Sequence, residues 1–91
     1  MSDTLTAADV ARWMVERLRV ERLLYQETVV YEIAKRFGGA FTYVNDNGNL
    51  AIDRRVLSEF RKLTEPDIVW DRGERMWRLR EPYDGPRRQV E

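Results

Sequence analysis

The sequence predicts an α+β fold, in which three helices are followed by a C-terminal two-stranded β-hairpin. Three stretches carry apolar residues spaced three and four positions apart, which is typical of amphipathic helices: residues 7–22, 28–37 and 54–64. Two short apolar segments then flank a polar, glycine-containing stretch within residues 67–80, which indicates a hairpin. A chain of 91 residues has room for one domain with a modest hydrophobic core.

The first predicted helix covers residues 7–22. Thr6 and Asp9 have the spacing of a capping box, in which each side chain accepts a hydrogen bond from the backbone N–H of the other residue. The apolar positions after them recur at helical intervals and define the buried stripe: Val10, Trp13, Met14 and Leu18. Residues 1–6 form an N-terminal extension before this helix, and residues 23–26 form a short link with some strand character after it.

The second predicted helix covers residues 28–37. Its apolar positions fall on one stripe: Val29, Val30, Ile33, Ala34 and Phe37. Lys35 and Arg36 stand in the last turn, where positive charge interacts favourably with the helix dipole. Gly38-Gly39 then provides the stop signal.

Residues 40–52 have a different character, with apolar residues on both sides of a polar run. Asn47-Gly48 within that run is a strong turn signal, and both a small hairpin and an ordered loop remain open. The run also has some likeness to a calcium loop with Gly48 at its sixth position. That register puts Tyr43 at the first position and Arg54 at the twelfth, where carboxylate ligands are needed, so we expect no metal here.

The third predicted helix covers residues 54–64. Asp53 is a good N-cap residue, and Pro66 ends the helix because proline restricts the residue before it to extended conformations. The apolar positions between them form the predicted buried stripe: Val56, Leu57, Phe60 and Leu63.

The predicted hairpin covers residues 67–80, with Arg72-Gly73 at its tip. A two-residue turn there pairs Ile68 with Trp77 and Trp70 with Arg75. That register places four apolar side chains on one face: Ile68, Trp70, Trp77 and Leu79. We expect the hairpin and the helices to share one core, whose members are buried and mutually close: Ile33, Phe60, Leu63 and Trp77. The domain then spans residues 7–81, and residues 82–91 form a C-terminal tail.

This order of elements is that of a winged helix, a helix-turn-helix variant with a C-terminal wing. Residues 7–86 also resemble a family of small bacterial proteins of unknown function. The stretches that carry the resemblance are Ala8-Asp9-Val10-Ala11-Arg12-Trp13-Met14, Asn45-Asp46-Asn47-Gly48-Asn49-Leu50-Ala51-Ile52 and Val69-Trp70-Asp71-Arg72-Gly73-Glu74-Arg75-Met76-Trp77-Arg78. The resemblance implies a winged-helix-like architecture and a bacterial origin, and it implies no activity. Residues 38–53 depart from the helix-turn-helix pattern, which joins its second and third helices by a turn of about three or four residues.

The composition excludes several classes of function. The chain has no Cys and no His, so it has no thiol nucleophile, no Ser-His-Asp triad and no His-bearing zinc site. No pair of acidic residues is marked out by an apolar setting, and we expect no enzymatic activity, catalytic residue, cofactor or small-molecule substrate. We also expect no membrane segment and no signal peptide, and therefore a cytoplasmic protein.

Two hypotheses remain for a non-enzymatic binding module. In the first, duplex DNA is the partner, and the phosphate and base contacts come from the third helix and the wing: Arg54, Arg55, Arg61, Lys62, Arg72 and Arg75. In the second, the module binds another protein or itself, which requires no basic face and suits a net charge of zero. Trp13, Tyr25 and Tyr31 are predicted core residues, and the alternative for them is an exposed dimer contact. A continuous positive surface favours DNA, whereas interspersed charges favour protein.

Overall fold

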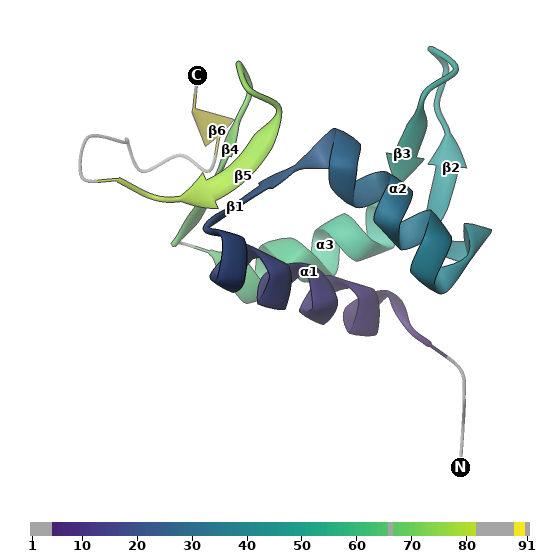
Figure 1. The fold of residues 1–91 in the computed structure, drawn as a ribbon, viewed down its shortest axis with the longest axis horizontal. Coiled ribbons are helices and arrows are strands. Elements are labelled where there is room, and N and C mark those ends of the chain that lie inside the picture. The colour runs from purple at the N-terminus through teal and green to yellow at the C-terminus, as the bar shows by residue number, and fades with distance from the viewer. Residues whose placement is uncertain (1–4, 66, 82–88, 91) are drawn as a thin grey trace.

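Residues 5–65, 67–81 and 89–90 are described by a computed structural model of the chain, and their fold is α+β (Figure 1). The helices are α1 (Ala7–Glu21), α2 (Gln26–Phe37) and α3 (Arg54–Thr64), with a 3-10 turn, η1, at Gly39–Phe41. The strands are β1 (Leu23–Tyr25), β2 (Thr42–Val44), β3 (Leu50–Ile52), β4 (Ile68–Asp71), β5 (Met76–Leu79) and β6 (Gln89–Val90). The three helices predicted from the sequence are confirmed within these residues, and α2 begins at Gln26 rather than at Thr28.

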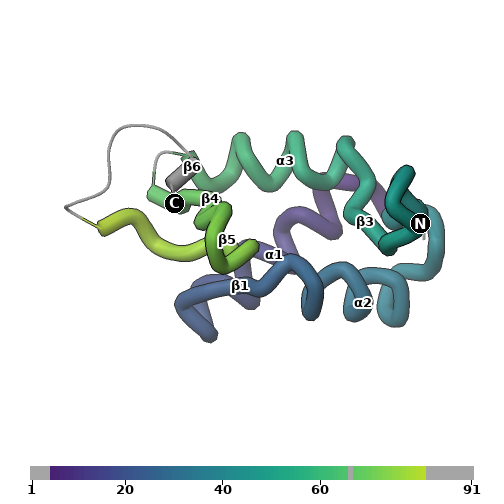
Figure 2. The backbone as a smooth tube through the Cα atoms, turned by 90° about the horizontal axis from the view of Figure 1, so that it is seen from above, coloured from purple at the N-terminus to yellow at the C-terminus, as the bar shows by residue number. Residues whose placement is uncertain are grey.

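The strands form two separate sheets at opposite ends of the helices. The larger sheet has the order β1-β5-β4-β6, and the smaller sheet is the β2–β3 hairpin. Figure 2 shows α2 and α3 along opposite sides of the molecule with α1 between them, and α1 and α3 make the most extensive contact between helices. The predicted extension and tail lie largely outside the described residues, except that the backbone of β6 pairs in parallel with β4.

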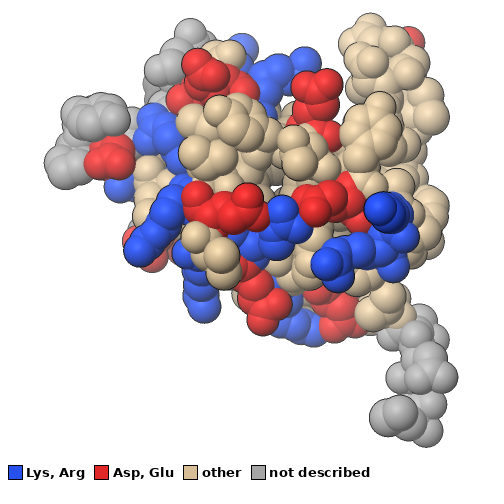
Figure 3. All heavy atoms as spheres, in the orientation of Figure 1, with Lys and Arg blue, Asp and Glu red and all other residues tan. Residues whose placement is uncertain are grey.

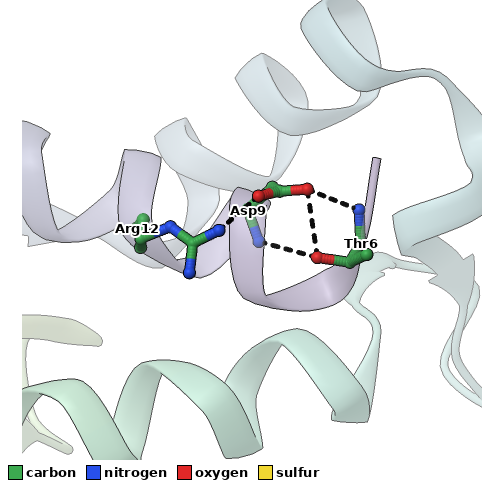
Figure 4. Close-up of polar contacts among 3 residues, drawn as sticks. All are labelled: Thr6, Asp9 and Arg12. Atoms are coloured by element: carbon green, nitrogen blue, oxygen red, sulfur yellow. Dashed lines mark hydrogen bonds and ion pairs between the residues drawn. The ribbon is translucent and has the colours of Figure 1, made fainter. Parts of the chain in front are cut away.

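The capping box that the sequence predicts at the start of α1 is present (Figure 4). Thr6 Oγ1 accepts a hydrogen bond from the Asp9 N–H at 3.2 Å, and Asp9 Oδ2 accepts one from the Thr6 N–H at 2.9 Å. Arg12, one turn further along, forms an ion pair with the same carboxylate. Hydrogen bonding from the Thr6 backbone, followed by that from its side chain, holds the pKa of Asp9 below its usual range.

We expect this box to make the stability of the fold depend on pH. The folded-state pKa of Asp9 is lowered, so its contribution is present above the unfolded-state value of about 4 and is lost as the pH falls through the folded-state value. The Asp9→Asn variant should therefore lose less unfolding free energy than the wild type between about pH 5 and pH 2, measured by denaturant titration. Asp46→Asn, in the exposed β2–β3 loop, is the control and should lose as much unfolding free energy as the wild type over this pH range. Equal losses of unfolding free energy in the wild type and the Asp9→Asn variant would contradict this role.

The core lies between the three helices, with the larger sheet closing it at one end. Its buried members come from almost every described element: Val10, Ala11, Met14, Leu18, Leu24, Val29, Val30, Ile33, Phe41, Ile52, Val56, Phe60, Ile68 and Trp77. The Phe60 and Trp77 rings meet edge to face, with centroids 5.2 Å apart and planes at 71°. The shared core of helices and hairpin is thus confirmed for Ile33, Phe60 and Trp77.

The prediction that Leu63 is buried is wrong, because its side chain is 46% exposed. The buried residues of α3 are Val56, Phe60 and Thr64, which lie four positions apart along one line of the helix. Leu63 falls at the edge of that line, and Thr64 occupies the buried position instead. The Thr64 hydroxyl donates a hydrogen bond to the Phe60 carbonyl oxygen at 2.7 Å, which satisfies it inside the core.

The β4–β5 hairpin differs from its prediction in loop length and register. Four residues, 72–75, connect the strands instead of two, and Trp70 pairs with Trp77 while Ile68 pairs with Leu79. The loop is held by Asp71, whose Oδ1 accepts a hydrogen bond from the Glu74 N–H at 3.1 Å. The register differs from the predicted one by two residues, and a shift of two preserves the faces, so the predicted apolar face is retained.

The larger sheet also has more strands than the predicted two-stranded wing. β1 pairs antiparallel with β5, so the short link between α1 and α2 is part of the sheet. β6 pairs with the other edge of the hairpin, so β4 and β5 are the two central strands. The strand character noted for residues 23–26 was the sequence signal from which β1 could have been added to the sheet.

The segment between α2 and α3, for which two interpretations were open, is a hairpin. β2 and β3 pair with Tyr43 opposite Ala51, and residues 45–49 form the connecting loop. Asn45 closes this loop, because its Oδ1 accepts hydrogen bonds from the N–H groups of Asn47 and Asn49, both at 3.0 Å. Gly48 has a φ of +78°, a conformation that glycine adopts without steric cost.

Candidate functional site

The six basic residues proposed as nucleic-acid contacts are all exposed, but they do not form one group. Arg54 and Arg55 lie in the first turn of α3, next to the β2–β3 hairpin, and Arg61 and Lys62 lie in its last turn. Arg72 and Arg75 lie in the β4–β5 loop, at the far end of β4 from α3 (Figure 1). The start of α3 and this loop are thus at opposite ends of the helical part of the molecule (Figure 2).

Three of the four basic residues on α3 form ion pairs with acidic residues of the same region. Arg55 contacts its own N-cap, with Nε 3.0 Å from Asp53 Oδ1. That hydrogen bond is the main reason why the pKa of Asp53 lies below its usual range. In the last turn, Arg61 pairs with Glu65, and Lys62 Nζ lies 3.2 Å from Glu59 Oε2.

Arg54 has a different environment from these three residues. Among the described residues its side chain has no ion pair or hydrogen bond, and it borders an open depression between the beginnings of α1 and α3. The depression is lined by Thr6, Ala7, Ala8, Arg54, Arg55, Ser58 and Glu59. Of the two described cations that line this depression, Arg55 is paired with Asp53 and Arg54 has no described side-chain partner. The carboxylate of Glu59 also lines the depression.

The β4–β5 loop presents Arg72 and Arg75 with Glu74 between them. Arg75 has a φ of +56°, and its carbonyl oxygen accepts a hydrogen bond from the Gln26 N–H at 3.1 Å. This bond fastens the loop to the first residue of α2. Below the loop, Trp77 is 5% exposed and belongs to the core, and the partly buried Trp70 packs against it with ring centroids 4.8 Å apart.

On the face shown in Figure 3, the surface charges are interspersed. Figure 3 shows Lys and Arg alternating with Asp and Glu over the body of the described chain, with no continuous positive face in this view. The face seen in Figure 3 therefore lacks the continuous positive surface that was expected for a DNA-binding module.

A cluster around Trp13 was only partly foreseen. The guanidinium carbons of Arg17 and Arg36 lie 5.4 and 5.5 Å from the centre of the half-buried Trp13 ring, which also meets Phe37 edge to face. The spacing of four between Trp13 and Arg17 was a readable signal, whereas the approach of Arg36 depends on how α1 and α2 pack. Tyr25 and Tyr31, predicted in the core, are both exposed.

The described residues offer neither a metal centre nor a membrane-spanning helix. No group of three or more acidic residues among them is arranged to hold a metal ion. In the same part of the chain, no helix has the length and apolar character needed to cross a bilayer.

Comparison with curated proteins and with solved structures found no significant match. A family model, described as a family of unknown function (DUF6953), matches residues 6–79. The match begins at the N-cap residue of α1 and ends with β5, so it contains all three helices and both hairpins. The resemblance to a family of unknown function is confirmed at that level, and the chain belongs to the DUF6953 family.

Proposed function

We propose that this chain is a non-enzymatic binding module whose partner is a protein rather than a nucleic acid. The observation that carries the proposal is the pairing of Arg55, Arg61 and Lys62 with acidic residues on α3 and at its two caps. A phosphate that approached this helix would have to displace those acids or lie beside them, and either raises the free energy of binding. A protein partner with both signs of charge needs no such displacement.

We further propose a winged-helix-like architecture in a bacterial, cytoplasmic protein. Two features support the architecture: the order of elements from α1 to β5, and the pairing of β1 with β5, which joins the link between the first two helices to the hairpin. The β2–β3 hairpin lies beside the first turn of α3, which is the part of a recognition helix that contacts base edges. That position also supports a protein partner.

DNA binding is the second candidate, and Arg54 is the observation that favours it. This residue has no described partner and stands at the start of α3. In this alternative, Arg54, Arg55, Arg72 and Arg75 contact phosphates. The binding constant would then fall with salt on a log–log slope of about −3 to −4.

A salt-titrated binding assay with random-sequence duplex DNA separates the two candidates. We expect no measurable binding by fluorescence anisotropy even at low salt, about 20–50 mM. Binding with the slope above, flattened by about one unit for each of the Arg72→Ala and Arg75→Ala substitutions, would overturn the protein-partner proposal. Arg19→Ala, on α1, is the control and should leave the slope unchanged.

A further inference from the structure

The outer edge of β2 presents backbone groups that β3 does not use. In the β2–β3 hairpin, the Asp53 N–H donates to the Phe41 carbonyl oxygen at 2.8 Å, and the Asn45 N–H donates to the Asn49 carbonyl oxygen at 2.8 Å. Hydrogen-bonded and non-hydrogen-bonded pairs alternate along an antiparallel ladder. The intervening bonded pair is therefore Tyr43 with Ala51, and the N–H and C=O groups of Thr42 and Val44 point away from β3.

No other described strand pairs with this edge, because the smaller sheet consists of β2 and β3 alone. Natural proteins usually protect such an edge with Lys, Pro, a bulge or a covering segment. Residues 37–52 contain no Lys, Arg or Pro and one charged residue, Asp46, although 35% of the whole chain is charged. Figure 3 accordingly shows the projecting hairpin as an almost uncharged surface beside a densely charged body.

The side chains of β2 suit a strand that is covered on its open edge. Tyr43 is 42% exposed and Val44 is 68% exposed, and Thr42 precedes them. β-branched and aromatic residues of this kind favour strand pairing and gain from contact with apolar neighbours. The backbone and the side chains therefore both point to an added strand as the occupant of this edge.

A second copy of the chain meets these requirements, because its own β2 has the same outward backbone groups and the same uncharged side chains. In an antiparallel contact centred on Tyr43, Thr42 of one copy lies opposite Val44 of the other, and the outward groups of both exchange hydrogen bonds. Residues 42–44 are uncharged, so no charge within the contact meets its own symmetry mate. The net charge of zero also leaves no overall repulsion between two copies.

We propose that two copies pair through β2 about a two-fold axis at Tyr43, which joins their hairpins into one four-stranded antiparallel sheet. This inference rests on the proposed function and specifies its partner as the chain itself. The paired strands have three residues each. The area that they bury is therefore well below the roughly 800 Å² per partner of a standard stable interface. The dimer should therefore be weak, with a dissociation constant on the order of 100 μM.

Sedimentation velocity over about 10 μM to 1 mM tests this dimer. The wild type should shift from monomer to dimer over that range. Val44→Lys should remain monomeric, because a charge on the edge strand opposes pairing. Val20→Lys makes the same change at an 80% exposed valine on α1 and should dimerise like the wild type.

The register can be tested separately, because the chain has no cysteine. In the proposed dimer residue 43 faces its own copy as a non-hydrogen-bonded pair, with Cα atoms about 4.5 Å apart, which suits a disulfide. Residue 44 is offset from its own copy by two positions and lies beyond disulfide reach. Mild oxidation should therefore crosslink the Tyr43→Cys variant at least about tenfold faster than the Val44→Cys variant.

The outcomes separate this inference from the proposed function. A wild type that stays monomeric to 1 mM, or equal crosslinking of the two cysteine variants, overturns pairing through β2. Dimerisation that survives Val44→Lys also overturns it, while leaving self-association intact. The DNA titration tests the protein-partner proposal independently, since binding of duplex DNA would overturn that proposal whatever the state of association.

Discussion

We expect Phe60→Ala to lower the free energy of unfolding by about 3–5 kcal/mol. Phe60 is fully buried in the centre of α3, and its ring packs against Trp77 from the larger sheet. Truncation removes the transfer free energy of the ring and leaves a cavity that the three helices and the sheet cannot close completely. For a domain with a total stability of about 5–15 kcal/mol, this is a large fraction of the whole.

Urea titration monitored by circular dichroism measures this loss, with Leu63→Ala as the matched control on the same helix. Because Leu63 is nearly half exposed, its truncation should cost less than about 1 kcal/mol. A Leu63→Ala effect as large as that of Phe60→Ala would show that Leu63 belongs to the core after all. Comparable midpoints for Phe60→Ala and the wild type would contradict the central place of Phe60.

The sequence was sufficient where structure depends on neighbouring residues. The capping box at Thr6 and Asp9 and the N-cap at Asp53 predicted where α1 and α3 begin. It was insufficient where two elements meet. Leu63 and Thr64 both border the apolar stripe of α3, and only the packing of α3 against its neighbours decides which is buried.

Loop lengths and strand pairing show the same limit. Gly73 suggested a two-residue turn in the β4–β5 hairpin, but the Asp71 side chain supports a four-residue loop by accepting a hydrogen bond from Glu74. The pairing of β1 with β5 joins residues about 50 positions apart, and no local pattern specifies such a contact.

The candidate site was predictable in part. The exposure of the four basic residues on α3 followed from their positions off its apolar stripe. The pairs Arg61–Glu65 and Lys62–Glu59 could also have been anticipated, since residues three and four apart on a helix are neighbours. The separation of Arg54 from the β4–β5 loop could not, because it depends on the direction of α3 relative to the sheet. The open edge of β2 could not be predicted either, because the sequence left both a hairpin and a loop open for this segment.

The second large effect is expected for Trp77→Ala, which should also lower the free energy of unfolding by about 3–5 kcal/mol. Trp77 lies on β5 between Phe60 of α3 and Trp70 of β4, so its indole ring joins the larger sheet to the helices. Its removal breaks two aromatic contacts and opens the end of the core that the sheet closes. Leu79→Ala, two positions along the same strand and partly exposed, is the control and should have a much smaller effect.

A double-mutant cycle with Phe60→Ala identifies how much of this loss belongs to the Phe60–Trp77 pair. The rings meet edge to face at 5.2 Å, an arrangement that contributes about 0.5–1.5 kcal/mol beyond the burial of their surfaces. Once either ring is absent, removing the other no longer breaks the contact between them. The loss of unfolding free energy in the double variant should therefore be smaller than the sum of the two single losses, by at least about that amount. Strict additivity within about 0.3 kcal/mol would mean that the two rings act independently, and that the sheet is held to α3 by other contacts.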